Sequence, residues 1–360
     1  MKIPSFLRCL FVTAVLTPAL LHAAGVPDLT AAMEAAAPGL KLRATVIAVE
    51  TRDGQTTFPS WHYKNEPDAT DFWPASTIKI YAAIAAMERL HAMGLPLETT
   101  LTFERREGTG PWVLDCARAV PEMLSEVWRR SSNEDYTLLL RFNGLDDLNS
   151  KFLTPERGFN RSALMRGYWS ARPYAYKPGE RQRITVRAQD GRMDFVEHLW
   201  SGRSYSAERG ASIIDSRTGN MASTRDLADC LRRLVFNDLI PAGERFRLSP
   251  EMLEFLLHGG NGFTGLETKD PDSGPHAWDA GKELFPKARY YHKVGLISNE
   301  VLELAVVDDR AQSGNAWIFC LRAGIGKEAV MVDLCRAVLT ELKNSSAPAP
   351  QTLPADIPSK

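Results

Sequence analysis

The hydrophobic pattern divides the chain into strands near both ends and helices in the middle. Apolar runs bounded by turn residues predict strands at Arg43–Glu50, Thr57–Tyr63, Arg289–Gly295, Val301–Val307 and Ala316–Arg322. Apolar residues spaced three and four apart predict helices at Asp28–Ala36, Thr77–Met93, Met123–Phe142, Ser223–Phe236 and Lys327–Lys343. This order favours a mixed α/β fold, in which a mixed sheet flanked by helices carries an inserted all-helical lobe at about residues 100–257.

A polar stretch rich in Arg, Tyr, Gly and Ser separates the central helices. It runs from Arg157 to Arg217 and is long for a plain connection, so we expect it to be functional or mobile. Within it, Ile184–Arg187 and Met193–Val196 are predicted to form one hairpin around a turn at residues 190–191.

The two chain ends differ in composition from the body. Residues 1–24 combine a positive start, an apolar run and small residues at the end, which is typical of a cleaved secretory signal peptide. A short membrane anchor is the alternative, although the run is shorter than the ~20 residues that a span needs. Residues 344–360 are rich in proline and are expected to be a disordered tail. Between these two ends, residues 26–343 are expected to form one domain. The predicted signal peptide indicates a periplasmic or secreted protein.

Charge and cysteine content narrow the classes of function. The formal net charge is −1 and no basic stripe indicates a nucleic-acid partner. No C-x-x-C or H-E-x-x-H spacing occurs, so neither a metal nor another cofactor is expected. Cys116, Cys230, Cys320 and Cys335 lie in apolar patterns, where disulfides and buried free thiols both remain open.

A candidate nucleophile stands at the start of the helix predicted from Thr77. The sequence Ser76-Thr77-Ile78-Lys79 places the Lys79 amine one helical turn from the Ser76 hydroxyl. A serine hydroxyl needs a group that takes its proton, and a helix start leaves backbone N–H groups free for an oxyanion. A solvated helix with a capping serine is the alternative, but the apolar flanks favour a buried helix. A lysine in a buried helix requires either a partner for its charge or a catalytic role.

Two further motifs follow in chain order. Ser131-Ser132-Asn133 precedes an apolar helix, where an ordinary helix cap is the alternative, and Lys293-Val294-Gly295 ends a strand. Together with Ser76-x-x-Lys79, these motifs resemble the S-x-x-K, S-D-N and K-T-G signatures of the penicillin-recognising serine enzymes, most closely the class A β-lactamases. The resemblance covers roughly Ala31–Leu339 and implies a β-lactamase/transpeptidase-like fold with its active site between sheet and helical lobe.

The resemblance also implies a role for each motif residue. Ser76 would be acylated, and Lys79 would help to remove its proton. Ser131 would pass a proton to the leaving amine, with Lys293 lowering the pKa of this hydroxyl from the opposite strand. Asn133 would hold the amide of the acyl group or Lys79.

The strand end would supply the remaining substrate contacts. The backbone N–H groups of Ser76 and of Leu296, which follows Gly295, would form the oxyanion hole. Family members carry Thr or Ser where this chain has Val294, and that hydroxyl binds the carboxylate of the substrate. Since valine makes no such hydrogen bond, carboxylate recognition should be weakened or rebuilt around another side chain, with Arg289 as the first candidate.

A second departure concerns hydrolysis of the acyl-enzyme. Class A β-lactamases use a Glu in a loop after the second motif to activate water, whereas Arg161–Trp169 contains no carboxylate. Tyr168 within this stretch is expected to pack, and Glu180 and Glu197 follow only later. Without a positioned base, attack of water on the ester should be slow.

These features predict an exported serine hydrolase that is acylated by a β-lactam or a related amide or ester. A DD-peptidase or esterase-like enzyme with slow deacylation remains open, as does a non-catalytic binder of peptidoglycan fragments. We expect a monomer whose partner is a small-molecule or cell-wall peptide substrate.

Overall fold

A computed structural model describes residues 26–65, 72–175, 177–211, 219–268, 276–324 and 328–346. The predicted signal peptide lies outside the described residues, as do residues 347–360 of the predicted tail. The closing helix α11 (Glu328–Ser346) continues three residues beyond its predicted end at Lys343. None of the described helices is long and apolar enough to cross a bilayer.

The larger sheet joins strands from both ends of the chain. Its order is β2-β1-β10-β9-β8, β3 also pairs with β1, and every pairing is antiparallel, so the fold is mixed α/β although the sheet itself is antiparallel. The predicted return strand is divided in two around Pro59, because proline has no N–H to donate. The strands are β1 (Lys41–Arg52), β2 (Gln55–Thr57), β3 (Ser60–His62), β8 (Arg289–Ile297), β9 (Glu300–Asp308) and β10 (Ala316–Gly324).

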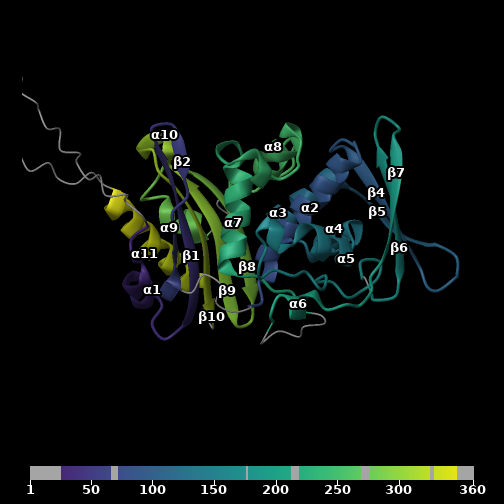
Figure 1. Cartoon of the computed structure of the whole chain (residues 1–360), viewed down its shortest axis with the longest axis horizontal. Helices are drawn as coiled ribbons and strands as arrows, with labels where there is room; N and C mark the ends of the chain where they lie inside the picture. The colour runs from purple at the N-terminus through teal and green to yellow at the C-terminus, as the bar shows by residue number, and fades with distance from the viewer. Residues whose placement is uncertain are drawn as a thin grey trace, which may run out of the picture.

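Helices cover both faces of this sheet, as Figure 1 shows. Trp317 and Phe319 of β10 belong to the core under α1, α9 and α11, whereas Ile318 and Cys320 belong to the core on the α7 side. Successive side chains of a strand point to opposite faces, so the continuous apolar run of β10 is that of a strand buried on both. The helices are α1 (Thr30–Ala36), α7 (Thr224–Val235) and α9 (His276–Gly281), together with α11.

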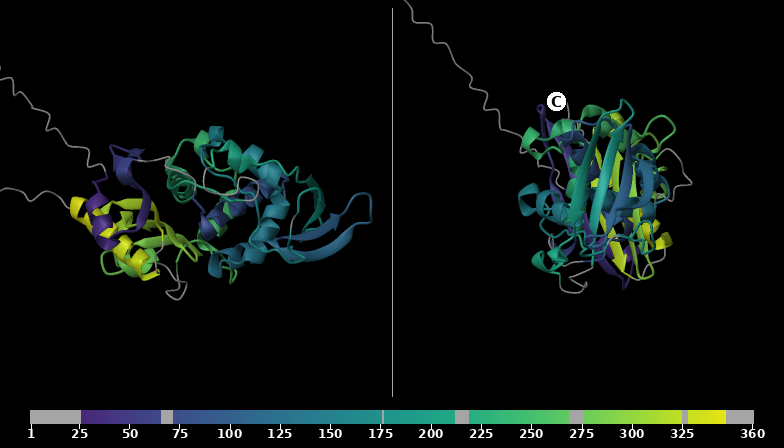
Figure 2. Two further views of the ribbon diagram at one scale, coloured as in Figure 1. Left: turned by 90° about the horizontal axis from the view of Figure 1, so that it is seen from below. Right: turned by 90° about the vertical axis from the view of Figure 1, so that its right-hand side faces the viewer.

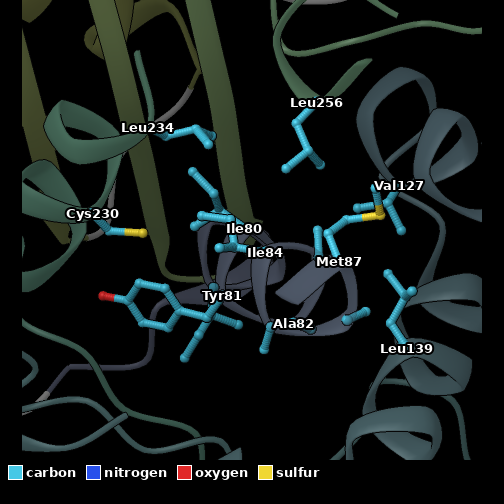
Figure 3. Packing of buried hydrophobic residues seen from close by; sticks show 14 of the residues in the cluster. Ile80, Tyr81, Ala82, Ile84, Met87, Val127, Leu139, Cys230, Leu234 and Leu256 are labelled. Carbon is cyan, nitrogen blue, oxygen red and sulfur yellow. The ribbon is translucent and has the colours of Figure 1, made fainter. Parts of the chain in front are cut away.

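The helical lobe is built around α2 (Lys79–Ala92), which follows a 3-10 turn at Ala75–Ile78. The first ten residues of α2 are all buried, as the apolar flanks predicted. Figure 3 shows its side chains directed toward several neighbours at once, among them Val127, Leu139, Cys230, Leu234 and Leu256. The lobe also contains α3 (Val120–Arg129), α4 (Asn133–Asn143), α5 (Leu145–Asp147), α6 (Tyr205–Glu208) and α8 (Pro250–His258), with single turns at Leu148–Phe152, Pro155–Arg157, Asn237–Leu239 and Ala242–Glu244. Beside the larger sheet, α10 (Arg310–Ser313) connects β9 to β10, and a single turn at Tyr63–Asn65 follows β3.

A second, four-stranded sheet corrects the prediction that the inserted lobe is all-helical. Its antiparallel order is β5-β4-β6-β7, and the right-hand view of Figure 2 shows it in front of the helices. The predicted hairpin is β6 and β7, whereas the other two strands were not predicted. Leu101 and Phe103 alternate with polar residues there, which is the pattern of a strand with one covered face. The strands are β4 (Thr99–Arg106), β5 (Val113–Ala119), β6 (Arg181–Ala188) and β7 (Met193–Leu199).

The helix predicted over Met123–Phe142 is two helices, α3 and α4. Ser131 lies between them with a φ of 53°, in the left-handed region that a helix cannot continue through. Ser132 then caps α4, because its Oγ accepts a hydrogen bond of 3.1 Å from the backbone N of Asp135. Hydrophobic spacing alone did not detect this break, although the two serines mark it.

Candidate active site

Ser76 lies half-buried in the tight turn that leads into α2. Ala75 before it has a φ of 46°, a conformation that non-glycine residues rarely adopt. The turn is closed by Thr77, whose backbone N and Oγ1 donate to the carbonyl of Pro74 at 3.2 and 2.5 Å. Backbone N–H groups in a first turn lack partners within the helix, so this turn offers Ser76 together with potential oxyanion donors.

Lys79 is fully buried one turn further along. Its Nζ donates to Asn133 Oδ1 at 2.7 Å and to Ser131 Oγ at 3.1 Å, and it also contacts the backbone carbonyl of Ser131. Burial, and after it the charge of Lys293, lower the pKa of Lys79 to about 6, against a raising effect of Glu134. An amine with this pKa is mostly neutral at pH 7 and is able to accept a proton.

The hydroxyl of Ser131 lies between two amines. Lys293 Nζ donates to Ser131 Oγ at 2.9 Å and to the carbonyl of Val294 at 3.0 Å, while Lys79 approaches the same oxygen from α2. Burial lowers the pKa of Lys293 to about 8, and the charge of Glu303 opposes this shift. The structure therefore connects two lysines of different pKa through one hydroxyl.

Strand β8 passes close to the Ser76 turn, and Gly295 is the residue that allows it. A Cβ added at Gly295 would lie 3.0 Å from the carbonyl oxygen of Pro74 and 3.2 Å from the Cβ of Ala75. A side chain at this position would therefore require the strand or the turn to shift by a few tenths of an ångström. The third predicted motif is thus placed directly against the first.

The outer edge of β8 presents backbone donors toward this turn. β8 is the last strand of the sheet, and the backbone N of His292 donates to Leu266 O at 3.2 Å on the side away from β9. Backbone N–H groups alternate in direction along a strand. The N–H of Leu296, four residues on, therefore points to the same open edge, as an oxyanion donor would have to.

The segment 161–169, which contains no carboxylate, contributes an aromatic side chain to the border of the site. Tyr168 Oη donates to the carbonyl of Ala75 at 2.9 Å. Its ring stacks on Trp73 with centroids 6.2 Å apart and lies 5.0 Å from the ring of Tyr136. Lys79 Nζ lies 5.8 Å from the centroids of both tyrosine rings. Tyr168 packs, as expected, and it does so against the turn that carries Ser76 and against Lys79.

Asn220 holds the segment before Tyr168 in place, and sequence reasoning did not single it out. Its buried side-chain oxygen accepts hydrogen bonds from the backbone N of Met165 at 2.6 Å and of Arg166 at 3.0 Å. Its nitrogen donates to the carbonyl of Arg166 at 2.9 Å. A lone asparagine 52 residues beyond Tyr168 carries no motif by which the sequence would reveal this role.

Three other residues considered from the sequence lie outside the site. Glu180 is buried in an ion pair with Arg172. Glu197 is exposed on β7 of the second sheet. Arg289 forms a 2.8 Å ion pair with Glu267 at the far end of β8. Neither glutamate is therefore positioned as a base, and Arg289 is not positioned to replace the hydroxyl missing at Val294.

A pocket of about 220 Å³ opens at the end of the site beside Ser131 and Lys293. Val294 and Leu296 of β8 form one wall, and Trp128 at the end of α3 contributes to another. The predicted site residues are thus brought together around one turn, one helix start and one strand edge.

Comparisons with known proteins show the fold. No protein-family model matches the sequence, and no curated protein matches it. Among solved structures, a β-lactamase from Sphaerobacter thermophilus matches with a TM-score of 0.52 and 15% identity, covering 88% of this chain and 95% of that one. A class A β-lactamase from Mycobacterium abscessus matches with a TM-score of 0.50 and 15% identity, covering 88% of this chain and 99% of that one. The structure of PBP-A matches with a TM-score of 0.53 and 16% identity, covering 88% of this chain and 96% of that one.

The chain therefore has a mixed α/β, β-lactamase/transpeptidase-like fold, as the three motifs predicted. At these identities the likeness concerns the fold alone.

Proposed function

We propose that this protein is an exported serine hydrolase in which Ser76 is acylated by a β-lactam or a related amide or ester. The observation that carries the proposal is the placement of the Ser131 hydroxyl between Lys293 and Lys79, the residue one helical turn from Ser76, in a β-lactamase-like fold. Burial keeps Lys79 able to accept a proton, which a nucleophilic serine requires.

The proposed acylation transfers one proton along this chain of groups. Ser76 Oγ bonds to the substrate carbonyl carbon while its proton moves to Lys79, and the backbone N–H groups of Ser76 and Leu296 stabilise the oxyanion. When the C–N bond breaks, Ser131 gives its proton to the leaving nitrogen and regains one from Lys79. Lys293, 2.9 Å away, stabilises the negative charge that develops on the Ser131 oxygen.

The acyl-enzyme is expected to be long-lived. Hydrolysis needs a water molecule with a base beside it, but the rings of Tyr168 and Tyr136 face Lys79. Glu180 and Glu197 lie elsewhere. This arrangement favours a slowly deacylating, DD-peptidase-like enzyme over an efficient β-lactamase.

Intact-mass measurement after incubation with benzylpenicillin tests the proposal. We expect one adduct per molecule and a burst of product equal to the enzyme present, followed by slow turnover. The adduct should be absent from Ser76→Ala and present in Ser170→Ala, a matched change at an exposed serine of the neighbouring loop. Adduct on Ser76→Ala would refute the assignment of the nucleophile, and rapid turnover without adduct would refute slow deacylation. A protein that neither benzylpenicillin nor a fluorophosphonate labels would instead be a binder without catalysis.

A further inference from the structure

The second sheet has one face against the helical lobe and one face turned away from it. Leu101 and Phe103 of β4 and Ile184 of β6 are fully buried on the inner face. Because successive side chains of a strand point to opposite faces, the residues between them belong to the outer face. In the right-hand view of Figure 2 the sheet lies in front of the helices, so that its outer face is toward the viewer.

Large apolar side chains are exposed at both edges of this outer face. Met193, Phe195 and Leu199 lie at alternating positions of β7, and Leu114 of β5 pairs with the outer-face residue Glu104. These four side chains, the apolar group, are between 48% and 65% exposed. They are half of the eight exposed large apolar side chains found among the described residues. Such a concentration on one face indicates a contact surface, whereas single exposed apolar residues do not.

The same face carries more positive than negative charge. Arg183 forms an ion pair of 2.8 Å with Glu104. The other three arginines of the face have no carboxylate partner among the described residues. The whole chain has a net charge of only −1, so the positive charge is a local excess. By strand register, the charged residues of the outer face are Glu104 and Arg106 of β4, Arg181, Arg183 and Arg187 of β6, and Glu197 of β7.

An aromatic ring holds one of the three unpaired arginines in place. The ring of Trp112, in the loop between β4 and β5, has the guanidinium carbon of Arg106 4.7 Å from its centroid and that of Arg183 4.5 Å away. A contact of this kind is attractive and leaves the charge on the guanidinium group. Arg106 is thus fixed on the face without a counter-ion, while Arg181 and Arg187 are exposed on β6.

We propose that the outer face of the second sheet docks on the surface of an anionic phospholipid bilayer. The apolar group would enter the boundary between headgroups and acyl chains, and the three unpaired arginines would contact lipid phosphates. Peripheral binding of this kind gains from buried apolar area and from attraction to anionic lipids together. The inference goes beyond the proposed function, because it involves none of the residues around Ser76.

Two other occupants fit the face less well. In a symmetric pair of copies the face would meet itself, so that unpaired arginines would approach arginines. A glycan strand binds through sugar rings that stack on exposed aromatic rings, but Phe195 is the one aromatic member of the apolar group. A bilayer accepts aliphatic and cationic side chains side by side, which is what this face presents.

Cosedimentation with vesicles tests the inference. The exported protein, as purified, is mixed with vesicles of phosphatidylcholine alone and with vesicles in which about one third of the lipid is phosphatidylglycerol. We expect binding to the anionic vesicles at low salt, and binding at least tenfold weaker at high salt or without phosphatidylglycerol, because the attraction is screened or absent. Equal binding to both kinds of vesicle, or binding to neither, overturns the inference.

Two double variants divide the contributions of charge and apolar area. Arg181→Gln/Arg187→Gln should weaken binding about 30-fold, since each arginine near an anionic surface contributes about fivefold. Phe195→Ser/Leu199→Ser should weaken it by at least tenfold through lost apolar burial. Binding that both variants retain at the wild-type level overturns the inference.

A matched control removes the same charge elsewhere. Arg52→Gln/Arg336→Gln changes two arginines of the larger sheet and of α11, whose side chains are 45% and 51% exposed. This variant should bind anionic vesicles like the wild type. A loss as large as that of Arg181→Gln/Arg187→Gln would mean that net charge and not this face determines binding, which overturns the inference.

Sedimentation velocity without lipid tests the competing occupant. Self-association of the wild type that is lost in Phe195→Ser/Leu199→Ser would assign the face to a second copy of the chain and overturn the inference. The substituted side chains are exposed, so the melting midpoints of all variants should stay close to that of the wild type. Acylation of Ser76 by benzylpenicillin should also be unchanged in every variant, so failure of vesicle binding is distinguishable from failure of the proposed function.

Discussion

Lys79 and Lys293 contact the same hydroxyl but differ in pKa, and the proposed chemistry depends on that difference. Both amines are buried, yet Lys79 has in addition the charge of Lys293 beside it, while Lys293 is compensated by Glu303. Their pKa values are lowered to about 6 and about 8. Between these values one lysine is neutral and the other is charged, which is the combination that a base and an electrostatic partner require.

Acylation of Ser76 should therefore follow a bell-shaped pH profile. The rate should increase as the pH passes about 6, because Lys79 must lose its proton before it accepts another, and should fall above about 8, where Lys293 loses its charge. The methyl ester of benzylpenicillin is the suitable probe, because it carries no carboxylate. In Lys293→Arg the alkaline fall should disappear, since arginine stays charged. A flat profile between pH 5 and 9 would contradict both assignments.

Removal of Lys79 should affect chemistry much more than folding. We expect Lys79→Ala to lower the acylation rate by roughly 10²- to 10⁴-fold, the usual contribution of a general base. Lys282→Ala, at an exposed lysine on the outer side of the sheet, should acylate like the wild type. Thermal melting measured alongside would show whether Lys79→Ala is folded. An unchanged acylation rate in a folded variant would place the base elsewhere.

At the scale of elements, the site depends on how closely the segment before Tyr168 approaches α4. A Cβ added at Gly167 would lie 2.5 Å from Oγ1 and 2.6 Å from Cγ2 of Thr137, a side chain that is itself buried. The absence of a side chain at Gly167 thus brings Tyr168 against the turn that carries Ser76. The close packing of Gly167 thus helps to position the turn that carries Ser76.

Gly167→Ala should destabilise the protein by about 1–3 kcal/mol, as overpacking of a buried contact does. It should also slow acylation, because the hydrogen bond from Tyr168 to Ala75 would be displaced. The free energy of unfolding in urea measures the first effect and labelling by benzylpenicillin the second. Gly243→Ala is the matched control, since an added Cβ there meets nothing within 4 Å and its φ is not in the left-handed region. Equal stability of the two variants would contradict the packing argument.

For the molecule as a whole, two separate cores lie on the two faces of the larger sheet. Cys320 contributes to the core shared with the helical lobe, and Cys335 to the core under α11. Cys230 is buried in the first of these, and Cys116 is half-buried on the second sheet. All four are free thiols, so packing and not cross-linking holds these parts together.

Thiol titration should reflect this distribution. In the native protein we expect slow reaction of Cys116 alone, because burial raises the pKa of each thiol and Cys230, Cys320 and Cys335 are also inaccessible. Unfolding should expose the other three, and the midpoint of thermal unfolding should be the same with and without reductant. A lower midpoint in reductant would reveal a disulfide.

The sequence by itself determined the elements and residues whose signals are local. Strands β8, β9 and β10 were predicted because their apolar runs are bounded by turn residues, and α7 because Ser223 caps an amphipathic run. Ser76 and Lys79 were recognisable together because one helical turn joins them. Such patterns depend only on residues a few positions apart in the chain, so they can be read without knowing how distant segments pack.

Only the tertiary structure decided the contacts between distant segments. Lys293 and Ser131 are 162 residues apart in the chain, and no local pattern states that they share a hydrogen bond. Strand β4 was missed because its alternation is short and gains meaning only beside β6, and β5 because no alternation of apolar and polar residues marks it before it pairs with β4. Tyr168 acquires its place from Asn220 and Gly167, and His276 from Glu303. The pKa values of the two lysines likewise follow from burial, which arises only when both chain ends and the inserted lobe pack together.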